Sequence, residues 1–285
     1  MSYRHYLHRR GYSPESVKNY VSSAERYKKW IKENGRVEVE QMIQKDILPY
    51  IQHLKAEKRA LSTINNVVIY LRSYYDYLQR EEIVTNNPLR NLQLKGGKRA
   101  ITENPLTPQE LGELYQTYTK PRQYREPLHE TTHKRNQLIV SLMIYQGLHS
   151  GELGKLQKGD INVMEGKIKI AGSRRSNSRT LALGPHQIIP LHGYLQLMCQ
   201  DQQSLFTVRM YDVVKQLIKE LKEINPSIRN ASHIRSSVII NWLKHYDKRE
   251  VQYRIGHKYI SSVEHYERQE LSELESLLEQ HHPLK

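Results

Sequence analysis

The sequence predicts a mainly helical protein in two domains, with one small antiparallel sheet in the second domain. Three observations support this fold class. Apolar residues recur at helical spacing through residues 14–78, two short alternating runs lie within residues 167–183, and a glycine- and lysine-rich stretch separates the two regions. We expect a helical domain over residues 1–97, a linker over 98–106 and a mixed α/β domain over 107–285.

The first domain carries three amphipathic faces. Pro14 follows Ser13, which is typical of a helix start. Pro49 lies inside the second face, where we expect it to kink or break the helix. Ser62 or Thr63 is expected to cap the third helix. The apolar positions of the three faces are, in order, Val17, Tyr20, Val21, Ala24, Tyr27 and Ile31; Val39, Met42, Ile43, Ile47, Ile51 and Leu54; and Ile64, Val67, Val68, Leu71, Tyr75 and Leu78.

Positive charge dominates the sequence. The 285 residues carry a formal net charge of +14, and the first 100 hold 19 Lys+Arg against 10 Asp+Glu. Such an excess predicts a polyanionic partner, with double-stranded DNA as the first candidate and an anionic membrane surface as the alternative. The basic helices could clamp DNA or could form a solvated bundle without that role. Positive charge also surrounds the start of the linker, and the residues expected to contact DNA there are Lys95, Lys98 and Arg99.

The composition narrows the cellular setting. The single cysteine, Cys199, excludes an internal disulfide and is typical of a reducing compartment. No apolar run approaches the ~18 residues that a membrane span needs, and the N-terminal residues do not resemble a secretory signal. We therefore expect a cytoplasmic, nucleoid-associated bacterial protein without a membrane partner. The chain has 20 tyrosines and one phenylalanine, so tyrosine is expected to be the core aromatic residue.

The stretch RIGHKYISSVEHY, which ends at Tyr266, combines a turn, a histidine and a helix that carries a tyrosine. Gly256 allows a tight turn before His257, and Ser261 or Ser262 is expected to cap the helix. A phenol is a poor nucleophile at neutral pH and needs cations or hydrogen-bond donors around its target. This stretch resembles the last active-site motif of the tyrosine recombinases, the phage integrase family.

Three further stretches resemble catalytic motifs of the same family, in the same order along the chain. GLHSGEL, which begins at Gly147, matches the first box except that His149 replaces its arginine. The glycine of the predicted hairpin is followed by Ser173, where the family has a catalytic lysine. NASHIRSS keeps the arginine of the second box as Arg235 but has Ser232 at the histidine position. The active site is therefore expected to be divergent.

The replaced positions change the expected chemistry. Arginine is always charged and binds phosphate through a planar fork, whereas histidine is only partly protonated at neutral pH. Arg174 and Arg175 lie in the hairpin turn. Arginine is a poor proton donor at working pH, so we expect these two residues to bind DNA and not to replace the catalytic lysine. Lys167 and Lys169 are nearby substitutes for the missing lysine. Another cation, Arg135 or Arg174, would have to reach the phosphate in a rewired site.

The resemblance implies an N-terminal SAM-like core-binding domain, a catalytic domain and a mechanism. Tyr266 attacks a DNA phosphate and forms a 3′-phosphotyrosyl link, while Arg235 and His257 stabilise the charge on the phosphate oxygens. The 5′ hydroxyl of a partner strand then reseals the break. The implied mechanism uses no metal or other cofactor, and strand exchange brings four protomers together on DNA. The leucine stripe over residues 271–278 packs either on a neighbouring protomer or on its own domain.

Two other functions remain open at this point. The three replaced positions would also suit a catalytically silent DNA-binding protein that regulates recombination or transcription. A zinc hydrolase is suggested by the H-E-x-x-H pattern of His129, Glu130 and His133, with Glu152 as a conceivable third ligand. The polar, proline-containing flank of this pattern predicts instead a loop that runs into a helix near Thr132.

Overall fold

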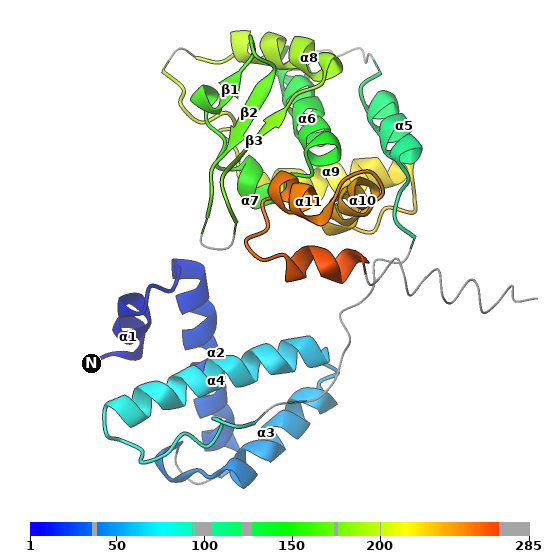
Figure 1. Cartoon of the computed structure of the whole chain (residues 1–285). Helices are drawn as coiled ribbons and strands as arrows, with labels where there is room; N and C mark the ends of the chain where they lie inside the picture. Colours follow the sequence, from blue (N-terminus) through cyan, green and yellow to red (C-terminus); the bar gives the residue numbers. More distant parts are fainter. Residues whose placement is uncertain are drawn as a thin grey trace, which may run out of the picture. The chain divides into compact units, whose positions relative to one another are not determined.

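The residues that the computed structural model describes are 1–35, 39–92, 94, 104–120, 127–173, 176–199 and 201–267 (Figure 1). The chain divides into two compact units, Met1–Ala100 and Ile101–Lys285. Over these residues the first unit consists of helices and turns, and the second combines helices with a three-stranded antiparallel sheet. The predicted fold class is therefore confirmed. Among the described segments, no helix is long and apolar enough to cross a membrane.

The helices of the first unit are α1 (Tyr3–Arg9), α2 (Pro14–Glu33), η1 (Val39–Gln41), α3 (Gln44–Ala56) and α4 (Leu61–Arg80). Helix α2 begins where the sequence predicts, because the Ser13 side chain accepts a hydrogen bond from the backbone N–H of Ser16 and Pro14 takes the first helical position. Tyrosine is a core aromatic residue, as expected. Tyr27 and Tyr75 are fully buried, and their hydroxyl oxygens lie 3.3 Å apart.

The second amphipathic face does not form one kinked helix, so this prediction is wrong. The face is divided between η1 and α3, and Ile43 between them is 60% exposed. Pro49 lies inside α3 and does not end it. Because Pro49 sits in the second turn, the intrahelical hydrogen bond that it removes is one to the carbonyl of Lys45, in the first turn of the helix. The rest of α3 is stabilised by burial of its apolar side.

The start of α4 also differs from the prediction. The helix begins at Leu61, and Ala60 takes the N-cap position without a side-chain hydrogen bond. Ser62 and Thr63 therefore lie in the first turn, not at the cap. The apolar face of α4 is buried as predicted, so packing against α2 compensates for the missing cap.

The helices and strands of the second unit are α5 (Pro108–Tyr118), α6 (Pro127–Tyr145), α7 (Ser150–Leu153), η2 (Lys158–Asp160), β1 (Ile161–Asn162), β2 (Lys167–Ile170), β3 (Arg179–Ala182), α8 (Pro185–Gln196), α9 (Met210–Ile224), α10 (Ala231–Leu243) and α11 (Lys248–Ile255), followed by a helical segment over 261–267. Figure 1 shows α8 at one end of this unit and α10 with α11 at the other, with α6 running between them. Helix α5 starts at the capping box that the sequence predicts, formed by Thr107 and Glu110.

Helix α6 begins earlier than predicted. The segment expected to be a loop before Thr132 belongs to the helix, which starts at Pro127. Proline suits the first helical position because its missing N–H would have no intrahelical partner there. The mostly apolar second half of α6, from Leu138 to Ile144, is buried at every position and anchors the helix in the core. Tertiary packing therefore outweighs the low helix propensity of the threonines.

The antiparallel sheet has the strand order β1-β2-β3, which confirms the predicted hairpin. Ile168 pairs with Leu181, and Ile170 pairs with Arg179. Side chains alternate between the two faces of a strand, so Arg179 and Leu181 both start from the buried face of β3. Strand β3 begins one residue earlier than the alternating run that starts at Thr180, and this one residue brings an arginine into the interior.

Candidate active site

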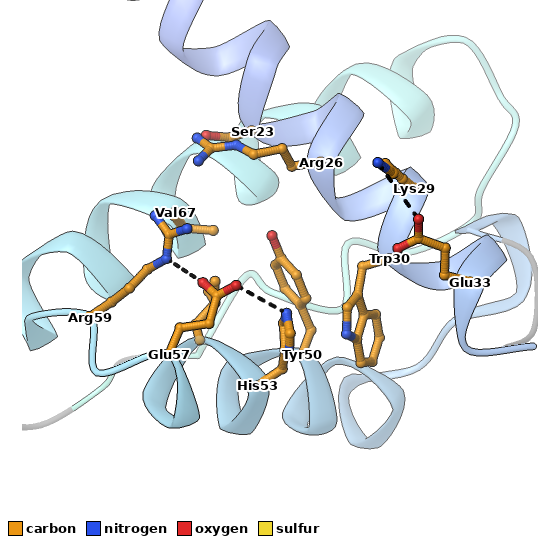
Figure 2. A pocket seen from close by; sticks show the side chains of 11 residues that line it. Ser23, Arg26, Lys29, Trp30, Glu33, Tyr50, His53, Glu57, Arg59 and Val67 are labelled. Carbon is orange, nitrogen blue, oxygen red and sulfur yellow. Dashed lines mark hydrogen bonds and ion pairs between the residues drawn. The ribbon is translucent and has the colours of Figure 1, made fainter.

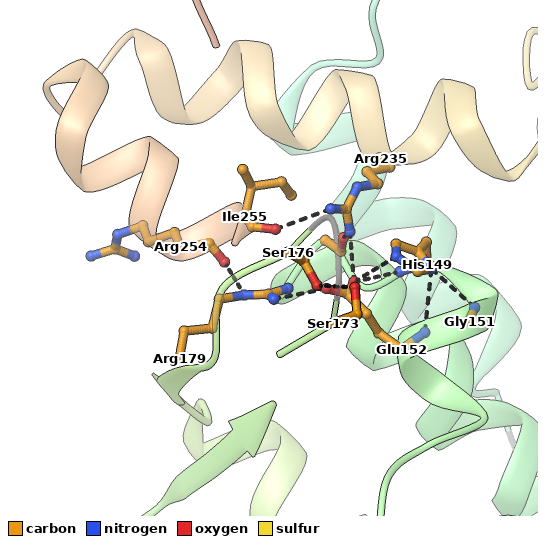
Figure 3. Close-up of polar contacts among 10 residues, drawn as sticks. His149, Gly151, Glu152, Ser173, Ser176, Arg179, Arg235, Arg254 and Ile255 are labelled. Atoms are coloured by element: carbon orange, nitrogen blue, oxygen red, sulfur yellow. Dashed lines mark hydrogen bonds and ion pairs between the residues drawn. The ribbon is translucent and has the colours of Figure 1, made fainter. Parts of the chain in front are cut away.

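Glu152 is the centre of the polar cluster in the second unit. It lies in the short helix α7, and its side chain is 4% exposed. Arg179 Nη1 donates to Glu152 Oε1 at 2.7 Å, and Arg235 Nη1 donates to Glu152 Oε2 at 2.9 Å (Figure 3). Despite burial, these two guanidinium groups hold the pKa of Glu152 down at about 2. The carboxylate is therefore ionised and holds two cations side by side.

Arg235 is the predicted arginine of the second box, and the structure brings it into this cluster from α10. Its guanidinium also donates to the carbonyl oxygens of Gly147 and Ile255. These contacts connect the turn before α7 with the end of α11. The side chain is 15% exposed, so Arg235 is held firmly by three acceptors while part of it still reaches the surface.

Arg179 is the site residue that the sequence prediction missed. Its side chain is fully buried, and its Nε donates to the carbonyl oxygen of Arg254 at 2.7 Å (Figure 3). Its Nη2 is buried without a hydrogen-bond partner among the residues that the structure describes. The alternation of the strand could have identified it. Arg179 lies two residues before Leu181, and residues two apart in a strand point to the same face of the sheet.

His149 occupies the position of the family's first arginine and acts as the N-cap of α7. Its Nδ1 accepts hydrogen bonds from the backbone N–H groups of Gly151 and Glu152, at 3.0 and 3.2 Å. A ring nitrogen that accepts two hydrogen bonds carries no proton of its own, so the ring is the neutral Nε2–H tautomer. Desolvation and the cations Arg235 and Arg179 lower the pKa of His149, against the opposing effect of Glu152. His149 therefore adds no fixed charge to the site.

Gly256 and His257 form the turn that the sequence predicts at the end of α11. Gly256 is the C-cap with φ of +76°, a left-handed conformation that favours glycine. Its carbonyl accepts from the backbone N–H of Asn177 at 3.0 Å, and Ser176 pairs with His257 in an isolated β-bridge. The segment that leads into β3 is thus joined to the turn that carries the histidine.

Tyr266 lies in the helical segment 261–267 and its ring stacks on His257. The two ring centroids are 6.3 Å apart, with an angle of 16° between the planes. Tyr266 also packs at the edge of a small apolar cluster that contains Ile255 and Val263. The helical segment begins at Ser261, and the carbonyl of Ile260 accepts its first hydrogen bonds. The expectation that Ser261 or Ser262 is the N-cap is therefore wrong.

The other two replaced positions, Ser173 and Ser232, lie in the hairpin turn and in α10. Ser173 and Ser176 close the hairpin turn, with their hydroxyl oxygens 2.9 Å apart. Ser232 is exposed on the first turn of α10. Its neighbour His233 is buried and contacts the carbonyl of Asn104 at 3.0 Å, so that histidine holds the start of the unit and does not replace the missing one. Several predicted positions lie outside the described residues: Lys95, Lys98, Arg99, Arg174, Arg175 and the leucines 271–278.

Arg135 does not supply the replacement cation that the sequence suggested. Its guanidinium donates to the side-chain oxygen of Asn136, at 2.8 and 3.1 Å. It lines a separate cavity together with Tyr194 and Met198. The second arginine of the cluster is Arg179 instead.

The H-E-x-x-H pattern lies on α6, where Glu130 and His133 each contact a residue one helical turn further along. Glu130 pairs with Lys134 at 2.8 Å, and His133 Nε2 contacts the Gln137 amide at 2.8 Å. Glu152, considered as a third ligand, is held by two arginines. Over the described ranges, no group of three histidine, cysteine, aspartate or glutamate side chains could hold a metal ion.

A basic cavity of about 190 Å³ lies in the first unit between α2 and α3 (Figure 2). Three cations line it, but two of them face carboxylates. Lys29 pairs with Glu33 at 3.7 Å, and Arg59 pairs with Glu57 at 2.6 Å. These pairs reduce the cavity's net charge, so the excess positive charge of the unit is a property of its surface and not of this cavity.

We expect Gly256→Ala to destabilise the second unit by roughly 2–5 kcal/mol. An alanine in the left-handed region costs roughly 1–2 kcal/mol, and a Cβ at Gly256 would lie only 2.2 Å from Arg179 Nη1, which must then be displaced. Gly166→Ala is the matched control. Gly166 also has positive φ, +59°, but a Cβ there meets its nearest neighbour at an ordinary 3.4 Å. Equal losses in urea unfolding of the two variants would contradict a tight Gly256–Arg179 contact.

The second unit should also lose stability in mild acid because of His257. Burial, followed by the charges of Arg235 and Arg179, lowers its pKa from 6.5 to about 4, with Glu152 opposing and His149 adding slightly. Between pH 6.5 and 4, His257 is therefore protonated in the unfolded chain but not in the folded chain, so the free energy of unfolding falls as pH falls. We expect a loss of about 1–3 kcal/mol over this window.

His257→Gln should remove most of this loss, and the melting temperature measured from pH 7 to 4 checks it. His245→Gln, at an exposed position, should retain the wild-type slope. Below this window the low pKa of Glu152 continues the trend, because its stabilising charge is lost as pH falls towards 2. An identical slope in His257→Gln and wild type would show that His257 already titrates normally in the folded protein.

Sequence comparison identifies the class of protein that this fold and site belong to. Residues 1–82 match the phage integrase N-terminal SAM-like domain, and residues 104–273 match the phage integrase family. The second match alone covers more than half of the chain. The chain belongs to the phage integrase family, and the resemblance seen in its motifs is confirmed.

Individual relatives are tyrosine recombinases. XerC from Lacticaseibacillus casei (strain BL23) is 25% identical over 296 residues, which cover 96% of this chain and 94% of the relative. XerD from Oceanobacillus iheyensis is 23% identical over 295 residues, which cover 96% of this chain and 94% of that protein. These similarities extend over both units of the chain.

Solved structures share the fold. XerH site-specific recombinase bound to palindromic difH substrate has a TM-score of 0.74 at 17% identity, covering 95% of this chain and 82% of XerH. A lambda integrase dimer bound to a COC′ core site has a TM-score of 0.68 at 17% identity, covering 93% of this chain and 74% of the integrase.

Proposed function

We propose that this protein is a site-specific DNA recombinase that cleaves and rejoins strands through a 3′-phosphotyrosyl intermediate on Tyr266. One observation carries the proposal. In a member of the phage integrase family, Tyr266 stacks on His257, and Arg235, which Glu152 holds in place at 2.9 Å, donates to the carbonyl of Ile255 two residues before that histidine. A phenol, a ring donor and a fixed guanidinium are the groups that attack on a phosphate requires.

Each group has a distinct part in the proposed strand cleavage. The Tyr266 oxygen forms a bond to phosphorus, and the bond to the 5′ oxygen breaks. The phenol gives up its proton, and the leaving 5′ oxygen takes one up. Arg235 neutralises charge that builds on the non-bridging oxygens. His257, neutral at pH 7 because its pKa is near 4, adds one hydrogen bond without a charge.

The two parts of the chain would share the work on DNA. Residues 1–97 form the core-binding domain in this proposal, residues 98–106 the linker and residues 107–285 the catalytic domain. The net charge of +14 supports contact with duplex DNA. The solved relatives include XerH bound to difH and lambda integrase bound to a core site, which supports the same partner here. We further propose that the protein works as an oligomer on DNA, with four protomers in the synapse.

A catalytically silent DNA-binding protein is the second candidate function. The observation in its favour is the use of His149 as a neutral helix cap, which leaves the family's first arginine position without a charge. Ser173 and Ser232 likewise lack the proton-transfer chemistry of the lysine and histidine that they replace. Such a protein would bind recombination sites and leave them intact.

The test uses nicked duplexes that carry candidate sites from the protein's own genomic neighbourhood. A nick beside the cleavage position lets the short fragment that carries the 5′ hydroxyl diffuse away after cleavage. Religation is then prevented, and the covalent adduct accumulates. We expect an adduct that survives denaturing electrophoresis, and binding that weakens steeply as salt rises. Binding without an adduct on any of these duplexes would favour the silent protein. No binding even at low salt would refute both functions.

A further inference from the structure

We propose that Arg179 is the second arginine of the active site, which supplies from β3 the fixed positive charge that His149 does not supply. The inference rests on the proposed function and names a residue that the family motifs in this sequence do not contain. Arg179 is a positioning residue, because its fully buried side chain acts through Glu152 and the Gly256–His257 turn. Three features of its surroundings support this role.

The first feature is the charge of the cluster. Glu152 accepts hydrogen bonds from both Arg179 and Arg235, so one negative charge lies in direct contact with two positive charges. The sum is one surplus positive charge, since His149 is held neutral by its capping hydrogen bonds and His257 by its low pKa. Without Arg179, the Glu152 carboxylate would neutralise Arg235. Arg179 therefore leaves Arg235 free to stabilise a phosphate.

The second feature is the mechanical connection to the turn. Arg179 Nε donates to the carbonyl of Arg254 at 2.7 Å, and the guanidinium lies against Gly256 where any Cβ would collide with it. The same stretch of chain binds the turn again through the hydrogen bond from Asn177 to Gly256. Arg179 thus sets the position of His257, on which the Tyr266 ring stacks.

The third feature is the unused donor. Of the guanidinium nitrogens, Nε and Nη1 have acceptors, while the buried Nη2 has none among the described residues. A buried donor left unpaired costs about 1–3 kcal/mol, and such a group in a folded protein calls for an explanation, of which a role in the active site is one. A purely structural arginine would be expected to use this donor. The geometry points to a charge kept in place for the site.

The experiment compares Arg179→Gln with Arg179→Lys and with the control Arg254→Gln. The control removes a guanidinium that stacks on Tyr246 at 3.9 Å, away from Glu152 (Figure 3). On the duplex that traps wild type, we expect Arg179→Gln to slow single-turnover adduct formation by roughly 10–100-fold. Arg179→Lys should retain most of the rate, and Arg254→Gln all of it. DNA affinity should not change in any of the three.

Two further measurements separate charge from structure. Adding His149→Arg to Arg179→Gln should recover the rate at least in part, because it returns a cation to the site. The loss caused by Arg179→Gln should also shrink on a duplex whose scissile phosphate is a neutral methylphosphonate, because less charge then needs stabilising. No rescue and an equal loss on both duplexes would overturn the proposal, since a merely structural role predicts that result.

A measurement without DNA keeps the inference separate from the proposed function. Nuclear magnetic resonance of the His257 ring in the folded proteins should give a higher pKa in Arg179→Gln than in wild type, and an unchanged one in Arg179→Lys. If wild type traps no adduct, the proposed function fails and this titration alone decides on Arg179. An unchanged His257 pKa in a folded Arg179→Gln protein would refute the inference. If Arg179→Gln does not fold, the rates of adduct formation of Arg179→Lys and of the double variant His149→Arg/Arg179→Lys decide in its place. A large loss of rate in Arg179→Lys that His149→Arg does not restore would then overturn the proposal.

Discussion

Glu152→Ala is expected to lower the free energy of unfolding of the second unit by about 3–5 kcal/mol, the typical effect of breaking a buried ion pair by removing one partner. The effect should be large because one carboxylate serves two guanidinium groups, and that of Arg179 is fully buried. The change would leave the positive charges of Arg179 and Arg235 facing each other in a largely buried site. Urea unfolding followed by circular dichroism measures the loss.

Glu165→Ala is the matched control for this prediction. Glu165 also forms an ion pair at 2.8 Å, with Lys167 of β2, but both side chains are more than half exposed. Exposed pairs contribute little because water screens them, so this variant should unfold like wild type. Glu152→Gln should fall between the two, because an amide oxygen can still accept one guanidinium. A wild-type unfolding curve for Glu152→Ala would mean that the arginines do not depend on this carboxylate.

The fold brings together three of the residues that the motifs identified. Arg235 comes from one stretch of sequence and His257 with Tyr266 from another, yet Arg235 reaches the end of α11 through the Ile255 carbonyl and His257 stacks on Tyr266. The sequence could predict them because each belongs to a local frame. A glycine that ends a helix or an arginine near the start of a helix leaves a recognisable pattern over a few positions.

Glu152 and Arg179 could not be predicted in the same way. Their role depends on a pairing between residues 27 positions apart, and neither local pattern states which partner lies across the core. Glu152 entered the sequence analysis only as part of a motif and as a possible metal ligand. The alternating run that the sequence shows begins at Thr180 and stops one residue short of Arg179, although Arg179 takes the same face as Leu181.

The largest functional effect is expected from Tyr266→Phe, which should reduce the covalent protein–DNA adduct to background while leaving DNA affinity unchanged. The substitution removes the hydroxyl that would bond to phosphorus and keeps the ring. The ring contacts that the structure shows, the stack on His257 and the packing near Val263, do not involve that oxygen. Folding and binding are therefore expected to survive. Denaturing electrophoresis of the nicked duplex after a fixed incubation gives the adduct yield.

Tyr259→Phe is the control. Because the chain contains 20 tyrosines, the loss of the adduct must be shown to be specific to Tyr266. Tyr259 lies only seven positions earlier, beside the same turn, but its side chain is 66% exposed and it has no place in the arginine cluster. This variant should form the adduct at the wild-type rate. Peptide mapping of the wild-type adduct by mass spectrometry should assign the DNA fragment to Tyr266. An adduct that persists in Tyr266→Phe, or that maps to another tyrosine, would place the nucleophile elsewhere, and the cluster around Glu152 would then need a different explanation.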